Sequence, residues 1–259
     1  SPQKTYLINQ ILQTMAMQNK ENICLNNKLE LYLFNAHFLF RKGLFKRSSK
    51  EIRTKILVNK PEYETASLFL DACQLYRSIA HIFESKAKKE ILKKIHSLEL
   101  EIINSHKITI QLSHIYDFLI STYNQDALSL QSACNSEEIK SFIQLLDAIR
   151  EKDCNTFMSR YYYYFCKSLS CIVTENMVNY HHYYKKLLDL YEEYPKKKEE
   201  ETHIYITICG NYLGSCMLIE EYDKMPVVLD LLANVNAPNY ETERRLFENI
   251  IIYRLIYFL

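Results

Sequence analysis

Residues Thr202–Val235 read THIYITICGNYLGSCMLIEEYDKMPVVLDLLANV, two apolar segments separated by a short polar one. In the first segment apolar side chains recur every four residues, which matches the 3.6-residue period of an amphipathic helix. In the second, Asp223 can cap the first turn and Pro226 lies where a missing backbone N–H is tolerated. The stretch therefore predicts a helix, a tight turn and a second helix.

Two of the chain's three glycines, Gly210 and Gly214, lie inside the first of these helices. A glycine in a helix interior costs about 1 kcal/mol relative to alanine, so it needs a reason. Residues four apart share one face of a helix. We therefore expect a neighbouring helix to pass very close to the face that carries both glycines.

The small residue Gly214, the aromatic Tyr222 after the turn, and the apolar Met225 and Leu229 resemble the tetratricopeptide repeat (TPR). A second segment, Leu29–Glu62, resembles the same repeat through Tyr32, Ala36, Leu39, Gly43, Phe45, Ser48, Ile52 and Pro61. The resemblance implies a right-handed helical solenoid with a concave binding face. It implies no catalytic residue.

The rest of the chain also favours helices, because three glycines and five prolines provide little turn material for a sheet. We predict helices over Pro2–Asn19, Leu29–Arg41, Phe45–Val58, Glu62–Glu84, Lys86–Asn104, Ile108–Tyr123, Ala127–Ala133, Ser136–Glu151, Asn155–Val173, Val178–Tyr194 and Tyr240–Leu259. The expected fold is all-α, with stacked antiparallel helical hairpins that form one TPR-like right-handed α-solenoid over residues 1–259.

The final segment, IIIYRLIYFL, is apolar on nearly every side. A solenoid normally ends in a helix with a polar outer face. We therefore expect this segment to be covered, either by a further helix of a longer array or by a second copy of the chain in a homo-oligomer.

The eight cysteines are scattered, and most occupy apolar helix positions, where a free thiol acts as a small hydrophobic group. No signal-peptide pattern and no run of 18 apolar residues is present. These features predict reduced thiols, a cytoplasmic location and no membrane insertion. Because the sequence begins with SerPro rather than Met, a removed targeting segment stays an open alternative.

Aromatic residues are the strongest compositional signal. Tyr161–Phe165 are five consecutive rings, and the helix that follows carries His182 and Tyr183 among further tyrosines. A helix turns by about 100° per residue, so five consecutive rings cannot all face one core. We predict an aromatic groove for a protein or peptide, formed by Tyr162, Tyr163, His182 and Tyr183. The alternative is bulky packing between helices, with the extra rings along the surface.

Positive charge is concentrated in Arg41–Lys60, which holds eight basic residues and one acidic residue. Lys46, Lys50 and Arg53 fall on one helical face and could contact the phosphates of an anionic partner such as nucleic acid. The alternative is a solvated outer face, or docking on the acidic half of another chain. Residues 1–107 carry 18 Lys and Arg against 10 Asp and Glu, whereas the remainder carries 14 against 21.

Catalytic and metal sites have little support. Cys166 and Cys171 are five apart, and the adjacent His181 and His182 point to different sides of a helix, so neither pair has metal-ligand spacing. No nucleophile elbow or phosphate-binding loop occurs. We expect a non-enzymatic scaffold without metal or cofactor that binds a protein or peptide. The alternatives are the sensor domain of a regulator that binds a small peptide, and a nucleic-acid binder.

Overall fold

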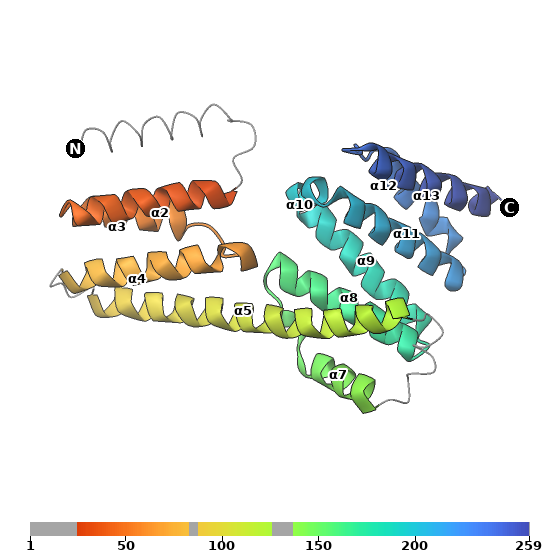
Figure 1. Ribbon diagram of the computed structural model, residues 1–259, viewed down its shortest axis with the longest axis horizontal. Helices are drawn as coiled ribbons and strands as arrows, with labels where there is room; N and C mark the ends of the chain where they lie inside the picture. Colours follow the sequence, from red (N-terminus) through yellow and green to blue (C-terminus); the bar gives the residue numbers. More distant parts are fainter. Residues whose placement is uncertain (1–24, 83–87, 126–136, 259) are drawn as a thin grey trace. The chain divides into compact units, whose positions relative to one another are not determined.

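A computed structural model describes residues 25–82, 88–125 and 137–258, and within these ranges it contains eleven α-helices and no strand (Figure 1). The prediction of an all-α fold is therefore confirmed. The helices expected over Pro2–Asn19 and Ala127–Ala133 lie outside the described residues. The contacts divide the chain into two compact units, Ser1–His106 (unit 1) and Lys107–Leu259 (unit 2).

Unit 1 is built from α2 (Leu25–Arg41), α3 (Phe45–Glu51), α4 (Ala66–Ile82) and the first part of α5 (Lys88–Gln125). Helices α2 and α3 are joined by a tight turn in which Gly43 has a φ of 73°, a conformation that favours glycine. The Ser48 hydroxyl donates to the Ala36 carbonyl oxygen at 2.8 Å, which holds α3 closely against α2.

The helix predicted over Phe45–Val58 differs from the observed one in its second half. After α3 the chain continues as a π-helix, Ile52–Ile56, in which the Leu57 N–H donates to the Ile52 carbonyl oxygen. Ile52 and Ile56 are both fully buried in the core of unit 1. π-Helical turns are rare in proteins, and those that occur often lie at functional sites.

Helix α5 corrects the prediction of two helices over Lys86–Asn104 and Ile108–Tyr123. The sequence between them is SerHisLys, which contains neither glycine nor proline, so nothing interrupts the backbone hydrogen bonds. Ile95 and Ile102 of α5 belong to the core of unit 1, and Leu112, Ile115 and Leu119 belong to the core of unit 2. The helix predicted over Glu62–Glu84 is also shorter, because a 3-10 turn, Tyr63–Thr65, precedes α4.

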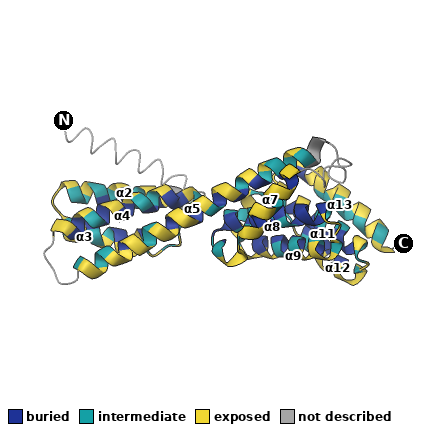
Figure 2. Ribbon diagram, turned by 90° about the horizontal axis from the view of Figure 1, so that it is seen from below, coloured by how far each residue is buried: buried dark blue, intermediate teal, exposed yellow. Residues whose placement is uncertain are grey.

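Unit 2 contains the remainder of α5, α7 (Glu137–Ala148), α8 (Phe157–Val173), α9 (Met177–Glu193), α10 (Pro195–Glu200), α11 (Thr202–Leu218), α12 (Met225–Ala233) and α13 (Tyr240–Phe258). Helix α8 packs on α9, α9 packs on α11, and α11 packs on both α12 and α13. Because only residues 174–176 join α8 to α9, these two helices form an antiparallel hairpin. Figure 2 shows buried residues along α8 and α11, in the interior of unit 2.

Several helix starts differ from the sequence prediction, among them that of α2, which begins at Leu25 rather than Leu29. Helix α8 begins at Phe157 rather than Asn155, because Thr156 is the N-cap and shares a capping box with Ser159. Helix α12 begins at Met225 after a 3-10 turn, so Asp223 does not cap it, although Pro226 does lie in the first turn. The lysine-rich segment before α11 forms a separate short helix, α10.

The expectation for the two helical glycines is confirmed. A Cβ placed on Gly210 would lie 2.5 Å from Oδ1 of Asn249, and one placed on Gly214 would lie 3.3 Å from the hydroxyl of Tyr253. Both neighbours belong to α13. The glycine face of α11 therefore leaves room for the Asn249 and Tyr253 side chains of α13.

Large apolar side chains are exposed on α13, among them Phe247, Ile251, Ile252, Leu255 and Phe258. What covers them stays a prediction. The six cysteines within the described ranges are buried free thiols. No helix in this part of the chain is long and apolar enough to cross a membrane. The single domain over residues 1–259 also stays a prediction.

Candidate functional site

Most of the aromatic run of α8 serves helix packing. Tyr161, Tyr163 and Tyr164 are buried, whereas Tyr162 and Phe165 are half-buried. The Tyr116 ring of α5 contacts both Tyr161 and Tyr162, with centroid distances of 6.4 and 5.2 Å. The Tyr161 ring also contacts Tyr191 of α9, with a centroid distance of 6.4 Å, so the aromatic run of α8 packs against both α5 and α9.

Three of the four predicted groove residues belong to two helices that pack on each other, Tyr163 to α8 and His182 and Tyr183 to α9. The rings of His182 and Tyr183 are 5.4 Å apart. Burial raises the pKa of Tyr163, and the electrostatic influence of Tyr183 on the adjacent α9 raises it further. We call Tyr163, His182 and Tyr183 the α8–α9 patch. Tyr162 lies on another side of α8, against Tyr116.

The patch differs from the other tyrosines of unit 2 in its hydroxyl groups. The hydroxyls of Tyr164, Tyr191 and Tyr205 donate to carboxylates of Glu151, Glu201 and Glu192 at 2.9, 2.7 and 2.7 Å. Within the described residues, the hydroxyls of Tyr163 and Tyr183 have no such partner. Burial raises the pKa of both phenols, so each keeps its proton at neutral pH and can donate a hydrogen bond.

Glu151 accepts two hydrogen bonds beside the patch. Its Oε1 accepts from the Tyr164 hydroxyl at 2.9 Å and from the Lys186 ammonium at 2.5 Å. Burial would raise the pKa of Glu151, but the hydrogen bonds from Lys186 and Tyr164 outweigh it and lower the pKa. The resulting carboxylate raises the pKa of both Tyr163 and Tyr183.

Cations lie over the rings at this border. The Lys186 ammonium is 5.3 Å from the centroid of Tyr164, and the Lys167 ammonium is 5.7 Å from that of Tyr163. Lys167 also pairs with Asp147 at 2.6 Å. Each of the two cations thus contacts one ring and one carboxylate, so its positive charge is compensated within the protein.

The adjacent histidines do point to different sides, because His181 is buried whereas His182 is exposed. His181 Nδ1 lies 2.9 Å from the Ser215 hydroxyl oxygen, and Nε2 lies 3.4 Å from a carboxylate oxygen of Glu221. Burial lowers the pKa of His181, as does the charge of Lys224, whereas Glu221 opposes them. His181 therefore links α9 to the end of α11 and the turn after it.

A polar pocket of about 370 Å³ also occurs in unit 2. It is lined by Glu200, Thr202, His203, Pro238, Asn239, Glu241, Thr242 and Arg245. Asn239 Oδ1 accepts from both the N–H and the hydroxyl of Thr242 at 3.0 Å, and the Thr202 hydroxyl donates to main-chain carbonyls. Its best-oriented polar groups are thus used within the protein, and we assign it no function.

The predicted basic residues Lys46, Lys50 and Arg53 are all exposed on the outer side of α3 and the π-helix. The sequence correctly placed them on one face, because the opposite residues Ser48 and Ile52 are fully buried. Glu151, His181 and Glu221 were not identified as site residues. Glu151 meets Lys186 across 35 residues of sequence, and no local spacing signals a contact of that kind.

Comparison with known proteins gives no match to any protein-family model, curated protein or solved structure.

Proposed function

We propose that this chain is a non-catalytic scaffold that binds a protein or peptide through the α8–α9 patch. The observation that carries the proposal is the pair of hydroxyls on Tyr163 and Tyr183, which are the tyrosine donors left without a partner among the described residues at that surface. Peptide main chains offer many carbonyl acceptors, and tyrosine combines an apolar ring with a donor.

The arrangement of helices supports a TPR-like right-handed solenoid as the scaffold. In unit 2, α8 packs on α9, α9 packs on α11 and α11 packs on α12, and α11 also packs on α13 beyond its nearest neighbour. Such stacking is the pattern of helical repeats, whose surfaces bind extended partners. In this proposal the patch provides recognition, and the glycine-mediated contact between α11 and α13 keeps the stack compact.

The chemistry of the patch favours recognition without reaction. Its tyrosines remain protonated, and Glu151 is already engaged by Tyr164 and Lys186. A partner would gain two hydrogen bonds and bury the exposed His182 ring. At about 0.5–1.5 kcal/mol per hydrogen bond, the two hydroxyls contribute roughly five- to a hundredfold to affinity.

A peptide-display selection on the immobilised protein tests the proposal. At about 0.15 M salt, where exposed charges are largely screened, we expect peptides that bind wild-type protein and bind a Tyr163→Phe, Tyr183→Phe variant at least fivefold more weakly. Tyr162→Phe is the matched control, because this ring lies on another side of α8. Selection of no peptide, or of peptides that bind all three proteins equally, would exclude the patch as the binding surface.

A further inference from the structure

A second surface, in unit 1, carries a different kind of recognition chemistry. Helix α3 and the π-helix that follows present Lys46, Arg47, Lys50 and Arg53 to solvent, and all four are exposed. We call these four residues the α3 basic face. The single acid of the segment, Glu51, pairs with Lys55 at 2.6 Å.

The orientation of the basic face is fixed by what lies opposite. Ser48, Ile52 and Ile56 are fully buried, and the hydroxyl of Ser48 donates to the Ala36 carbonyl oxygen of α2 at 2.8 Å. The helix cannot rotate about its axis without breaking this hydrogen bond and exposing both isoleucines. The four cations are therefore held outward by the core of unit 1.

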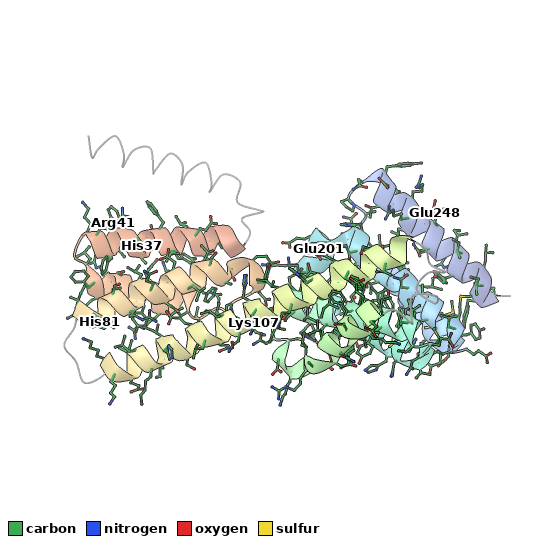
Figure 3. The ribbon with its side chains drawn as sticks, turned by 60° about the horizontal axis from the view of Figure 1, so that its bottom comes forward. His37, Arg41, His81, Lys107, Glu201 and Glu248 are labelled. Carbon is green, nitrogen blue, oxygen red and sulfur yellow. The ribbon has the colours of Figure 1, made fainter. Side chains whose placement is uncertain are left out.

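The cations of the α3 basic face are not neutralised within the described part of the chain. None of the four forms an ion pair there, although ion pairs of Lys55 and Arg77 occur in the same unit. Arg41 at the end of α2 extends the positive region, and Figure 3 shows its side chain at the tip of that helix. Like charges held together without counter-charges favour a polyanionic partner.

The composition of the face favours phosphate over other anionic surfaces. A helix that binds a membrane surface needs an exposed apolar face beside its cations. The isoleucines of this segment are buried in the core, and Leu44 and Val58 are exposed only beyond its two ends. Protein interfaces centre on apolar or aromatic anchors, which the basic face lacks. Arginine, present twice, binds phosphate oxygens with paired N–H donors.

We propose that the α3 basic face binds the phosphate backbone of nucleic acid, without reading its sequence. The π-helix supports this assignment, because the few π-helical turns found in proteins often lie at functional sites. Since phosphate contacts release bound counterions, the affinity falls with salt by about 0.9 logarithmic units per contact for each tenfold increase in concentration. This activity belongs to unit 1 and is independent of the α8–α9 patch in unit 2.

Fluorescence anisotropy with a labelled DNA duplex of mixed sequence tests the proposal on the full chain. At about 50 mM salt we expect binding, with a slope of log affinity against log salt of about −3 to −4. The Lys46→Glu, Lys50→Glu, Arg53→Glu variant should bind at least tenfold more weakly, with a slope reduced by about three. If charge reversal prevents folding, the milder Lys46→Gln, Lys50→Gln, Arg53→Gln variant is used, and it should also weaken binding and reduce the salt slope.

The matched control is Lys88→Glu, Lys89→Glu, Lys93→Glu on α5, which changes the same number of charges in the same unit. The proposal is overturned if DNA does not bind, or if this control weakens binding as much as the variant of the α3 basic face. Vesicles of phosphatidylserine and phosphatidylcholine provide the competing surface. Binding to vesicles without binding to DNA also overturns it, and identifies a membrane-surface contact instead.

Discussion

The two units use their positive charges in opposite ways. In unit 2 most lysines and arginines lie in ion pairs, such as Arg160 with Glu193 and Lys186 with Glu151. In unit 1 the α3 basic face has no ion pair within the described residues. Charge in unit 2 therefore belongs to the internal architecture, whereas charge on α3 is available to a partner.

The difference extends to the cores. Unit 2 is rich in buried tyrosines whose hydroxyls reach glutamates, as in Tyr191 with Glu201, an acid at the junction of α10 and α11 (Figure 3). The core of unit 1 contains mainly aliphatic residues and Phe69. Glutamates thus accept hydrogen bonds from three buried tyrosines of unit 2, whereas Tyr163 and Tyr183 have no carboxylate partner among the described residues. This difference makes the α8–α9 patch a candidate site.

The largest expected effect comes from the core of unit 2. Tyr191 is fully buried against Phe157 and Tyr205. Tyr191→Ala should lower the free energy of unfolding by about 3–5 kcal/mol, because a large cavity forms. Tyr191→Phe should cost about 1.5 kcal/mol, because it removes a hydrogen bond to a carboxylate.

Urea denaturation measures both Tyr191 variants, with Phe69→Leu as a core control in unit 1 that loses no hydrogen bond. If Tyr191→Phe is as stable as wild type, the hydroxyls do not hold the core of unit 2 and the contrast between the units fails.

A smaller effect is expected from the glycines. Gly210→Leu would overlap Asn249 of α13 and should destabilise unit 2 by about 2 kcal/mol. Gly43→Ala in unit 1 has open space around it and should cost about 1 kcal/mol, through its positive φ alone. Thermal unfolding followed by circular dichroism compares the two. A Gly210→Leu variant as stable as wild type would contradict the close contact between α11 and α13.

The pH dependence of stability tests His181. Burial and Lys224 lower its pKa in the folded protein, so the unfolded chain binds the proton more tightly. The stability that this group contributes is therefore present above its ordinary pKa of 6.5 and is lost as the pH falls below that value.

We expect the melting temperature of wild type to fall between about pH 7.5 and pH 5.5 more than that of His181→Gln, which has no proton to gain. The groups facing His181 are Glu221 and Lys224 on the turn after α11, Cys216 on α11, and His182 and Lys185 on α9. Equal pH slopes for the two proteins would show that His181 does not titrate in this range.

The smallest changes in stability are expected from substitutions of surface cations, and a cation in an ion pair should cost more than one without an ion pair. Arg160 donates to both carboxylate oxygens of Glu193, at 2.5 and 3.2 Å, and is partly buried. Arg160→Gln should cost up to about 1 kcal/mol. Lys50→Gln should change stability by less than about 0.5 kcal/mol. Chemical denaturation of the two variants would contradict the comparison if Lys50→Gln proved the more destabilising.

The sequence predicted features that depend on local spacing. The glycine face of α11 could be predicted because glycines inside a helix cost free energy and share a face at that spacing. The outward position of Lys46, Lys50 and Arg53 follows from the helical period alone. The role of Tyr163, His182 and Tyr183 as a binding surface stays a prediction, although the antiparallel hairpin does bring α8 and α9 together.

Other features depend on contacts between distant residues. Helix α5 was divided in the prediction at a segment that contains no helix breaker. The contact of Glu151 with Lys186 and the environment of His181 could not be predicted, since these partners lie 34 to 40 residues apart in the sequence. Tyr162 and Tyr163 are adjacent, and only the positions of the surrounding helices decide which one faces the patch.

Photo-crosslinking from position 183 tests the central claim most directly. Tyr183 is replaced by benzoyl-phenylalanine in the full chain, and the same group is placed at position 162 as control. Irradiation in extract of the source cells, treated with nuclease at about 0.15 M salt, should yield a discrete protein adduct from position 183 and none from position 162. Absence of an adduct from position 183, or equal adducts from both positions, would contradict recognition through the α8–α9 patch.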